Sequence, residues 1–510
     1  MLLIHPPVAK PCEPPVGIAT LAGALKAGGA SVRVLDAGTE ALLFLMDGVA
    51  SADDTWTRRA LRHRQTHRQA LVRWPIYAHR DRYGRAVLDL NRLLEAASRP
   101  SGVRVGLADY HDGARTPVRS QDLLTAAHDY KKSVFYPYFQ ARVGPIVTED
   151  APAWVGISLN YLSQALPAFA LIGFLRHGFP RTRIIIGGGL VTSWMSRPDW
   201  QNPFAGLVDR VVAGPGEDLL LELCGKDPGQ EEGSLPDFDA FFRSGYLAPG
   251  PVLPYAASRG CYWSKCAFCP ERAEGRGYRP RAPRQVIADL HALCDRHRPA
   301  LIHLVDNALS PALMGALADH PTVAPWYGFA RVSPQLADPE FCRALKRSGC
   351  VMIKLGLESG DADVLRRMGK GIDPTQAAAV LGALNRAGIA TYVYLLFGTP
   401  WEDEAAAERT LEFTAAHADT VDFLNLAVFN LPAHSPEAAA LTTRSFYAGD
   451  LNLYSDFVHP AGWSRGRVRR FLEKRFRRQP AIASILRRQP PLFTSNHAPL
   501  AVMARNRQAR

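Results

Sequence analysis

The 510-residue sequence contains no apolar run of the ~18 residues needed to span a bilayer. Its first residues, Met-Leu-Leu-Ile-His-Pro-Pro, also lack the charged n-region and the cleavage site of a secretory signal. The chain has only eight cysteines, too few and too scattered for a disulfide framework in so long a protein. We therefore expect a soluble, cytoplasmic protein without a membrane partner.

The excess of positive charge is concentrated at the C-terminal end. The formal net charge is +12, but Thr443–Arg510 contains 14 Lys and Arg against 3 Asp and Glu, so the rest of the chain is nearly neutral. A basic tail can bind nucleic acid, or it can be a solvated or packed helix face. Arg465–Phe476 has Val468, Leu472 and Phe476 on one helical face, which favours packing. No recognisable RNA-binding module accompanies it.

Residues 1–225 alternate between strand and helix patterns, which predicts a Rossmann-like parallel α/β sheet. The expected strands include Leu2–His5, Ser31–Asp36 and Trp154–Leu159, with helices at Pro15–Ala27 and Leu162–His177. The connection from about residue 39 to 150 is too long to be a simple loop and is largely helical in pattern. We expect it to form a helical insertion over one edge of the sheet.

Two glycine-rich turns follow later strands of this region. They are Gly187-Gly188-Gly189 and Gly214-Pro215-Gly216-Glu217. At the carboxyl ends of parallel strands, such turns let a ligand approach the backbone, although tight turns need glycine even without a ligand. The candidate cofactor-binding residues here are Gly187, Gly188, Gly214, Gly216 and Glu217.

Three of the eight cysteines, Cys261, Cys266 and Cys269, lie within nine residues, and Phe268 precedes the last one. Three thiolates can hold three corners of a [4Fe–4S] cluster and leave one iron open. A zinc site is the alternative, but it needs a fourth ligand, and no partner C-x-x-C or H-x3-H follows at zinc-finger spacing. We expect residues 226–254 to be a linker and Tyr255–Ser258 to be the strand that leads into the cysteines.

The cysteine loop resembles that of the radical S-adenosylmethionine (SAM) superfamily, which usually has C-x3-C-x2-C with an aromatic residue before the third cysteine. One extra residue before Cys266 is a departure. GLESG at Gly356–Gly360 and FGTPWE at Phe397–Glu402 follow in the family's order. The resemblance implies a partial (β/α)6 barrel over residues 255–435, followed by a basic, mainly helical extension over 436–510. It also implies reductive cleavage of SAM, with a donor such as flavodoxin or ferredoxin.

The same resemblance implies SAM contacts at several strand ends. Asp306 and Asn307 stand where the family often has Gly-Gly-Glu. Glu358 is expected near the polar groups of SAM, or alternatively as a helix cap. Arg331 is expected to face the SAM carboxylate or the substrate, or to be a surface ion-pair partner. The residues expected at the adenine are Gly398, Thr399 and Pro400.

The strand–Pro-Pro and glycine turns of residues 1–225 resemble the domain that precedes many radical SAM cores and binds cobalamin. The D-x-H-x-x-G motif is absent after the first strand, so cobalamin would bind without a lower histidine ligand. The alternative is a relic domain that binds substrate. We expect cobalamin-dependent methylation of an unactivated carbon in a small-molecule or peptide substrate. The alternatives are rearrangement, cyclisation or aminocarboxypropyl transfer, or a nucleic-acid-binding iron–sulfur redox or sensor protein.

Overall fold

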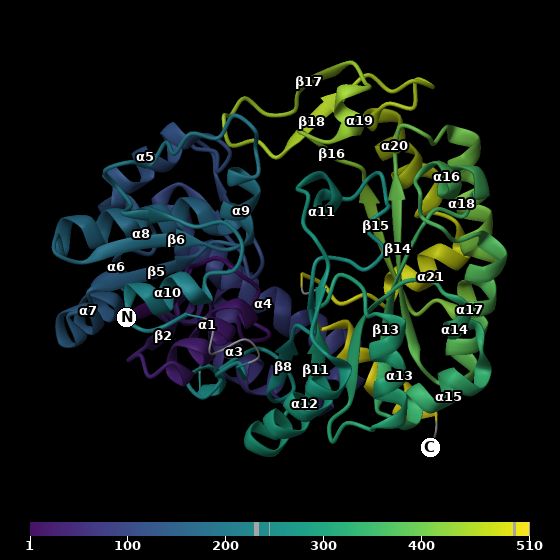
Figure 1. Ribbon diagram of the computed structural model, residues 1–510, viewed down its shortest axis with the longest axis horizontal. Coiled ribbons are helices and arrows are strands. Elements are labelled where there is room, and N and C mark those ends of the chain that lie inside the picture. The colour runs from purple at the N-terminus through teal and green to yellow at the C-terminus, as the bar shows by residue number, and fades with distance from the viewer. Residues whose placement is uncertain (229–233, 244, 493–495, 509–510) are drawn as a thin grey trace. The chain divides into compact units, whose positions relative to one another are not determined.

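The computed structural model describes residues 1–228, 234–243, 245–492 and 496–508. They form two compact units (Figure 1). The first unit comprises Met1–Pro251 with Tyr447–Leu453, and the second comprises Val252–Phe446 and Tyr454–Pro490 with the C-terminal helix. Across these described ranges, no helix combines the length and the apolar character needed to cross a bilayer.

A five-stranded parallel sheet in the order β2-β1-β5-β6-β7 forms the centre of the first unit. Its strands are β1 (Leu2–His5), β2 (Arg33–Asp36), β5 (Trp154–Ser158), β6 (Arg183–Gly187) and β7 (Arg210–Val211). The helices α1 (Val16–Ala27), α8 (Leu162–Gly178), α9 (Gly189–Met195) and α10 (Glu217–Leu223) accompany them. The strand order reverses between β1 and β5, and doubly wound sheets bind ligands at the carboxyl side of such a switch point.

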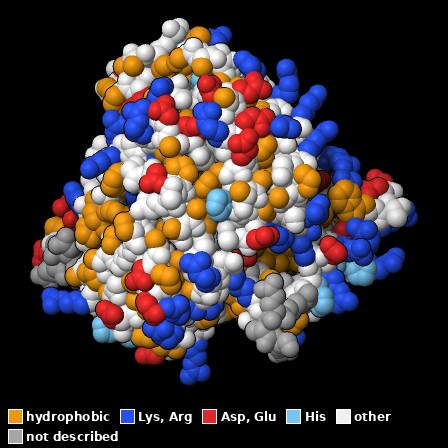
Figure 2. Space-filling model, turned by 90° about the vertical axis from the view of Figure 1, so that its right-hand side faces the viewer, with side chains coloured by type: hydrophobic (Ala, Val, Ile, Leu, Met, Phe, Trp, Pro, Cys, Tyr) orange, Lys and Arg blue, Asp and Glu red, His pale blue; other side chains and the backbone are white. Residues whose placement is uncertain are grey.

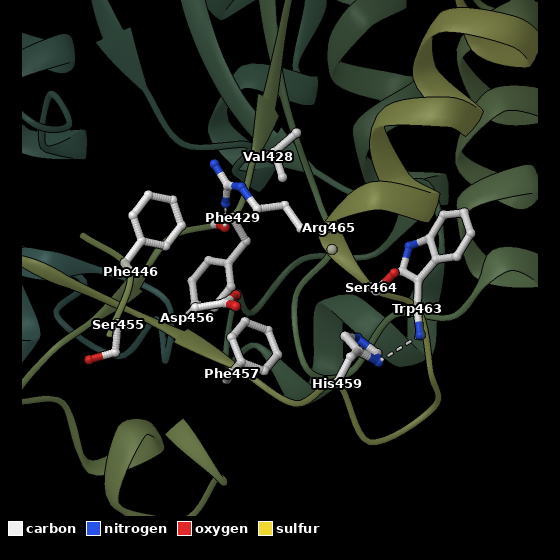
Figure 3. Close-up of a pocket in the computed structure, with 11 residues that line it drawn as sticks. Val428, Phe429, Phe446, Ser455, Asp456, Phe457, His459, Trp463, Ser464 and Arg465 are labelled. Carbon is white, nitrogen blue, oxygen red and sulfur yellow. Dashed lines mark hydrogen bonds between the residues drawn. The ribbon is translucent and has the colours of Figure 1, made fainter. Parts of the chain in front are cut away.

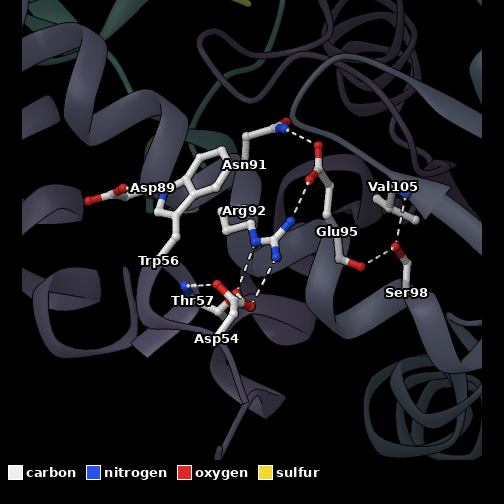
Figure 4. A network of polar contacts seen from close by, with 9 residues as sticks. All are labelled: Asp54, Trp56, Thr57, Asp89, Asn91, Arg92, Glu95, Ser98 and Val105. Atoms are coloured by element: carbon white, nitrogen blue, oxygen red, sulfur yellow. Dashed lines mark hydrogen bonds and ion pairs between the residues drawn. The ribbon is translucent and has the colours of Figure 1, made fainter. Parts of the chain in front are cut away.

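The helical insertion predicted for residues 39–150 is present and also contains a two-stranded hairpin. Its elements are α2 (Ala37–Gly48), α3 (Thr55–Leu71), α4 (Arg80–Ser98), β3 (Val103–Val105), β4 (Tyr110–Asp112), α5 (Ser120–His128), α6 (Tyr136–Tyr138) and α7 (Gly144–Asp150). The fully buried Asp89 of α4 accepts hydrogen bonds from Trp56 and Arg59 of α3, at 2.9 and 2.6 Å. Arg92 of α4 donates to Asp54 at 3.0 Å (Figure 4). Because an unpaired buried carboxylate is costly, these bonds hold the two helices in one register.

The described part of the predicted linker belongs to the first unit up to Pro251, and its last three residues begin β8 of the second unit. The Tyr246 hydroxyl donates to Asp36 at 2.6 Å, and the Asp237 amide donates to Ala19 O at 2.8 Å. Phe238 is fully buried, and the burial of this aromatic side chain stabilises the packing of the segment against the first unit. Within the range 226–254, residues 229–233 and 244 lie outside the described residues.

Six parallel strands in the order β15-β14-β13-β12-β11-β8 form the sheet of the second unit. They are β8 (Val252–Tyr255), β11 (Leu301–Leu304), β12 (Trp326–Ala330), β13 (Cys350–Glu358), β14 (Ala390–Phe397) and β15 (Phe423–Val428). The connecting helices are α12 (Pro283–His297), α13 (Pro311–Asp319), α14 (Pro334–Ala337), α15 (Pro339–Arg347), α16 (Ala362–Arg367), α17 (Pro374–Arg386) and α18 (Glu404–Ala416). They line the outer side of the curved sheet (Figure 1). This arrangement confirms the predicted partial (β/α)6 barrel.

The first barrel strand differs from the prediction. It spans Val252–Tyr255 instead of Tyr255–Ser258, and Ser258–Arg259 forms a separate short strand, β9, paired with β10 (Arg279–Pro280). Pro254 lies within β8 although proline lacks an N–H donor. An edge strand pairs on one side only, here with β11, so it tolerates this proline.

The C-terminal extension contains helices, as predicted, and also a small antiparallel sheet that was not anticipated. Its elements are β16 (Leu431–Pro432), α19 (Pro436–Ala439), β17 (Thr443–Ser445), β18 (Tyr454–Phe457), α20 (Arg465–Phe471), a π-helical turn at Leu472–Phe476, α21 (Pro480–Arg487) and α22 (His497–Gln508). Residues 493–495 and 509–510 lie outside the described residues.

The basic helix of this extension packs on the barrel. Val468 and Phe476 are fully buried, so the predicted apolar stripe is a packing face. Arg467 forms an ion pair with Glu404 of α18 at 2.6 Å, and further along Arg475 pairs with Glu408 at 2.9 Å. On the face drawn in Figure 2, Lys and Arg side chains are interspersed with Asp and Glu. Part of the tail's positive charge therefore serves docking within the second unit.

Candidate active site

The three clustered cysteines lie on one loop of the second unit, between β9 and α11 (Pro270–Ala273). We call Cys261–Cys269 the cluster loop. Cys266 is buried, and the other two thiols are half-buried. Gly260, just before the loop, has φ +72°, and a Cβ there would lie 2.6 Å from Gly277 O, so only glycine fits.

A Gly-Lys-Gly segment, Gly369–Gly371, holds the cluster loop in place. Trp263 Nε1 donates to Gly369 O at 2.9 Å. A Cβ on Gly369 would lie 2.7 Å from Lys265 O, and a Cβ on Gly371 would lie 2.2 Å from the Trp263 ring. The two glycines therefore allow this segment to pack directly against the loop that carries the cysteines.

Arg331, directly after β12, lies beside the central cysteine of the loop. Its Nη1 is 3.8 Å from Cys266 Sγ, and its guanidinium carbon lies 4.0 Å from the centroid of the Trp263 ring. It also donates to the carbonyl of Lys370. Arg331 is 6% exposed, so it is not a surface ion-pair partner. The sequence suggested a role at the SAM carboxylate or the substrate, whereas the geometry places its charge against a cysteine.

A buried ion pair lies next to this arginine. Lys370 Nζ is 2.7 Å from Glu358 Oε1, with side-chain exposures of 6% and 12%. Glu358 ends β13 at a bulge and has φ +71°, a conformation that non-glycine residues rarely adopt. A Cβ on Gly356 would lie 2.7 Å from Glu358 Oε1 and 2.9 Å from Lys370 Nζ, which explains the glycine. The ammonium lies 5.4 Å from the centroid of the Phe268 ring.

The helix-cap alternative for Glu358 does not hold, because Asp361 caps the following helix by accepting from the Val364 amide. Sequence reasoning did not assign a role to Lys370. A lysine held between two glycines was the available signal, but its partner could not be inferred without the fold. Burial raises the pKa of the Cys266 thiol, and the charges of Lys370 and Arg331 oppose that rise.

Asp306, after β11, supports the entry to the cluster loop. One of its oxygens accepts from the Ala257 amide at 3.0 Å, and the other accepts from the Ser258 hydroxyl. Burial raises the pKa of this carboxyl, and the hydrogen bonds oppose the rise. Asn307 is exposed beside it. In the structure, Asp306 therefore positions β9, while its expected contact with SAM stays a prediction.

Gly398, Thr399 and Pro400 form the turn after β14. Its Gly398 amide donates to Glu402, and Trp463 Nε1 donates to the same carboxylate oxygen at 2.9 Å. His459 Nε2 lies 2.8 Å from Thr399 O. Burial raises the pKa of Glu402 to about 7, so this carboxyl titrates near neutral pH. The turn expected at the adenine is thus fixed by side chains of the C-terminal extension.

The cluster loop and this turn share a small apolar core. Phe268 and Trp401 both pack against buried Val364 and Met368. The structure therefore brings the cluster loop, Arg331, Glu358 and the turn at Gly398 to the same end of the barrel, where (β/α) barrels carry their chemistry.

At the carboxyl edge of the first unit's sheet, polar side chains tie neighbouring strand ends together. The fully buried Gln164 donates to Pro6 O at 2.8 Å and accepts from the Asn160 amide at 2.9 Å, which joins the ends of β1 and β5. Asn160 accepts from the Gly189 amide at 3.0 Å, and Thr192 accepts from the Gly214 amide at 2.9 Å. These ties connect the switch point to both glycine-rich turns.

The predicted glycines occupy these turns. Gly187 ends β6. Gly188 has φ +103°, and a side chain there would not fit, because its Cβ would collide with Leu159 O. Gly216 precedes α10, and Glu217 is its first residue. Beside the switch point, Tyr161 and Leu162 are 57% and 37% exposed. This edge therefore presents apolar side chains above a rigid set of turns.

Comparisons with known proteins agree with this geometry. Residues 255–414 match the family model described as the radical SAM superfamily. The barrel of the second unit is therefore similar to the radical SAM domain over these residues. Enzymes of this family use a [4Fe–4S] cluster and SAM. In the part of the chain that the structure describes, no three His, Cys, Asp or Glu side chains are placed to hold a single metal ion. The three thiols with two cations beside them suit a cluster, which takes one thiolate at each of several irons.

Curated relatives are similar over part of their length. The uncharacterized methyltransferase PH0819 of Pyrococcus horikoshii is 24% identical over 305 residues, covering 53% of this chain and 66% of the relative. Hopanoid C-3 methylase of Methylococcus capsulatus is 26% identical over 287 residues, covering 50% and 54%. The chain thus spans between half and two thirds of these two relatives.

A solved structure is similar over most of the chain. The radical SAM methyltransferase TsrM from Kitasatospora setae, with cobalamin and a [4Fe–4S] cluster bound, has a TM-score of 0.52 at 15% identity. The match covers 88% of this chain and 83% of TsrM. At this identity the similarity establishes the fold.

Proposed function

We propose that this enzyme is a cobalamin-dependent methyltransferase that methylates an unactivated carbon of a small-molecule or peptide substrate. The observation that carries the proposal is the buried Cys266 thiol held against Arg331 and next to the Glu358–Lys370 pair. When bound, the cluster supplies the electron that cleaves the sulfonium bond of SAM. A flavodoxin or ferredoxin would deliver that electron.

The residues of the chain bind and orient the cofactors and exclude water from them. Cys261, Cys266 and Cys269 would hold the cluster, and the Arg331 charge would offset the negative charge of thiolate ligands. The Glu358 carboxylate can accept two hydrogen bonds, which suits a ribose diol or an ammonium group of SAM. Lys370, 2.7 Å away, would hold that carboxylate in its orientation. The turn at Gly398–Pro400 would take the adenine.

The first unit supports the cobalamin part of the proposal. Its strand order gives a switch point at which doubly wound folds hold flat, phosphate-bearing cofactors. Exposed Tyr161 and Leu162 offer apolar contact to a corrin face. TsrM, which shares the fold, contains cobalamin, and the curated relatives that match are methyltransferases. The absence of D-x-H-x-x-G favours binding without a lower histidine ligand.

The first experiment tests the radical chemistry. Protein reconstituted anaerobically with iron and sulfide is incubated with SAM and dithionite, and the nucleoside products are separated. We expect 5′-deoxyadenosine from the wild type and from Cys342→Ala, a buried cysteine on α15 away from the loop. It should not form in Cys266→Ala. Methylthioadenosine as the main product would instead indicate aminocarboxypropyl transfer and overturn the methylation proposal.

A second experiment tests cobalamin. Each variant is incubated with hydroxocobalamin, desalted, and assayed for retained cobalamin by its visible absorption. Tyr161→Ala removes an exposed aromatic group at the switch point, whereas Leu88→Ala removes a side chain that is 44% exposed on α4. We expect Leu88→Ala to retain cobalamin like the wild type and Tyr161→Ala to retain markedly less. Equal retention in both variants would contradict the placement, and no retention by the wild type would contradict cobalamin dependence.

A further inference from the structure

A small cavity lies in the second unit, where β15 ends against the C-terminal extension (Figure 3). Phe429, Phe457 and Arg465 are among the residues that line it. Its volume is about 20 Å³, and one buried water needs about 10–15 Å³, so no group of an organic substrate fits there. Affinity for a peptide substrate cannot come from this cavity. The helical insertion of the first unit, in contrast, presents an open and strongly charged surface.

Helices α3 and α4 of the insertion are rich in arginine. Residues 55–92 contain ten arginines and no lysine, against two aspartates. Nearby carboxylates pair with some of these arginines, since Asp89 binds Arg59 and Asp54 binds Arg92. Two such pairs offset only a small part of the excess. A large positive charge therefore remains on the two helices.

Three arginines of this segment extend into solvent. Arg62 on α3 and both Arg82 and Arg85 on α4 are exposed, and no described carboxylate lies within ion-pair distance of them. Asp81 is the one exposed acidic residue between positions 55 and 92, and it lies 3.9 Å from Arg80. Because exposed guanidinium groups without a counter-charge repel one another, they favour an anionic partner.

Trp56 and Leu88 add apolar groups to the same face of the insertion. Their side chains are 42% and 44% exposed. The guanidinium carbon of Arg92 lies 4.9 Å from the centroid of the Trp56 ring (Figure 4). Arg85, Leu88 and Arg92 are spaced three and four residues apart on α4, so they share one side of that helix. The exposed tryptophan of α3 therefore adjoins the exposed leucine and arginine of α4.

The α3 part of this face is fixed from below. Buried Asp89 accepts hydrogen bonds from Trp56 and from Arg59, which lie one turn apart. Arg62 follows Arg59 by a further turn, so it borders the same face. A surface that is ordered before binding loses less conformational entropy when a partner docks. We use the name α3–α4 surface for the exposed side chains Trp56, Arg62, Arg82, Arg85 and Leu88.

The composition of the α3–α4 surface favours an acidic peptide over a nucleic acid. Arginine binds carboxylates and phosphates alike through its planar guanidinium. Tryptophan and arginine are enriched among the residues that dominate protein interfaces, whereas nucleic-acid interfaces are more polar. Proteins that bind single-stranded nucleic acid stack successive bases on several aromatic rings. Trp56 is the one exposed Phe, Tyr or Trp ring among the described residues of α3 and α4.

We propose that the α3–α4 surface binds an acidic segment of a peptide substrate, in which carboxylates meet the arginines and apolar side chains meet Trp56 and Leu88. The inference rests on the proposed function, since it takes the substrate to be a peptide. It adds the chemical character of the segment that is recognised and the residues that select it.

Binding to the reconstituted full-length protein tests this inference without any turnover. The probe is a fluorescein-labelled peptide of about 15 residues, four helical turns, with Glu on one face and Leu on the other, followed by fluorescence anisotropy. The comparison probes have Lys in place of Glu, Ser in place of Leu, or are single-stranded RNA. We expect the Glu–Leu peptide to bind at least about tenfold more tightly than each of them, and less tightly at high salt. Tighter binding of the Lys peptide or of the RNA would overturn the proposal.

The variants compare two pairs of exposed arginines. The double variant Arg62→Glu with Arg85→Glu should weaken binding of the Glu–Leu peptide by about tenfold or more, because each substitution replaces attraction with repulsion. Arg386→Glu with Arg487→Glu, at exposed positions of α17 and α21, changes the total charge equally and should leave the affinity unchanged. Leu88→Ala should weaken binding by about fivefold.

Equal losses in the two double variants, or no loss in the first, would refute the assignment of the surface. So would a wild type that does not bind the Glu–Leu peptide. SAM cleavage with dithionite is measured on the same samples. Peptide binding without SAM cleavage would count against the proposed function alone, whereas cleavage without peptide binding would count against the α3–α4 surface alone.

Discussion

In the second unit, the strand ends beside the cluster loop carry paired charges, whereas in the first unit the strand ends at the switch point carry amides, hydroxyls and exposed apolar groups. Arg331 is buried 3.8 Å from Cys266 Sγ, and the Glu358–Lys370 pair lies beside this arginine, which donates to the Lys370 carbonyl. Gln164 and Asn160 connect the turns of the other sheet. The difference suits the two tasks proposed above, since electron transfer changes charge locally and a bulky organic cofactor needs shape and rigidity.

The largest effect should come from breaking the buried ion pair. Lys370→Met leaves the Glu358 carboxylate buried and unpaired, which we expect to destabilise the second unit by about 3–5 kcal/mol. The double variant Lys370→Met with Glu358→Gln removes both charges, so it should lose clearly less stability than Lys370→Met alone. Urea unfolding measures both changes. If the double variant loses as much stability as the two single variants together, Glu358 and Lys370 are not coupled. That result would contradict the claim that paired charges stabilise the strand ends of the second unit.

A second prediction concerns pH. Burial raises the pKa of Glu402 from 4.5 to about 7, so the folded state holds this proton more tightly than the unfolded state. The contribution of protonated Glu402 to the free energy of unfolding is therefore fully present below about pH 4.5. It is lost as pH rises towards 7, by an amount on the order of 3 kcal/mol. Glu402→Gln should remove this dependence. Urea unfolding at pH 5 and pH 8 checks it, and parallel pH profiles for variant and wild type would contradict it.

The first unit should respond more mildly. Gln164→Leu leaves the Asn160 amide and the Pro6 carbonyl without their side-chain partner, and we expect a loss of about 1–3 kcal/mol. Cobalamin retention should fall together with stability, because the β1 and β5 turns are no longer joined. The matched control is Gln335→Leu on α14 of the second unit, whose retention should not change. A Gln164→Leu protein with undiminished cobalamin retention would show that the ties are not needed for binding.

The smallest effect should be a shift in the cluster's midpoint potential. Arg331→Met removes a positive charge and an N–H donor beside Cys266, and reduction of a cluster adds negative charge. The potential should therefore become more negative, on the order of 59 mV if the reduced fraction at a given potential falls tenfold. Redox titration followed by EPR measures it. An unchanged or more positive potential would contradict the assigned contact, and Arg272→Met, whose partner is Glu437, is the control.

Much of the fold could be predicted from the sequence because its signals are local. Apolar strands such as Cys350–Glu358 and the nine-residue cysteine loop are recognisable without knowledge of distant contacts. The glycines at Gly188 and Gly398 were recognised as turns for the same reason. Their positive φ values of 103° and 79° agree with that assignment.

The features that the sequence did not reveal depend on tertiary contacts. Arg331 meets Cys266 across 65 positions of sequence, and Trp463 meets Glu402 across 61. The short strands of the C-terminal extension carry weak alternation, so their pairing becomes visible only in the folded chain. The role of Lys370 depends on the positive φ of Glu358, and no residue pattern in the sequence predicts that conformation.

The central claim is that the cluster loop holds a [4Fe–4S] cluster with one iron open to SAM. EPR spectroscopy of the reconstituted, dithionite-reduced protein before and after addition of SAM tests this claim most directly. The account predicts a cluster signal that changes when SAM is added in the wild type and in Cys342→Ala, and that is lost in Cys266→Ala. A signal that SAM leaves unchanged, or an intact cluster in Cys266→Ala, would contradict it.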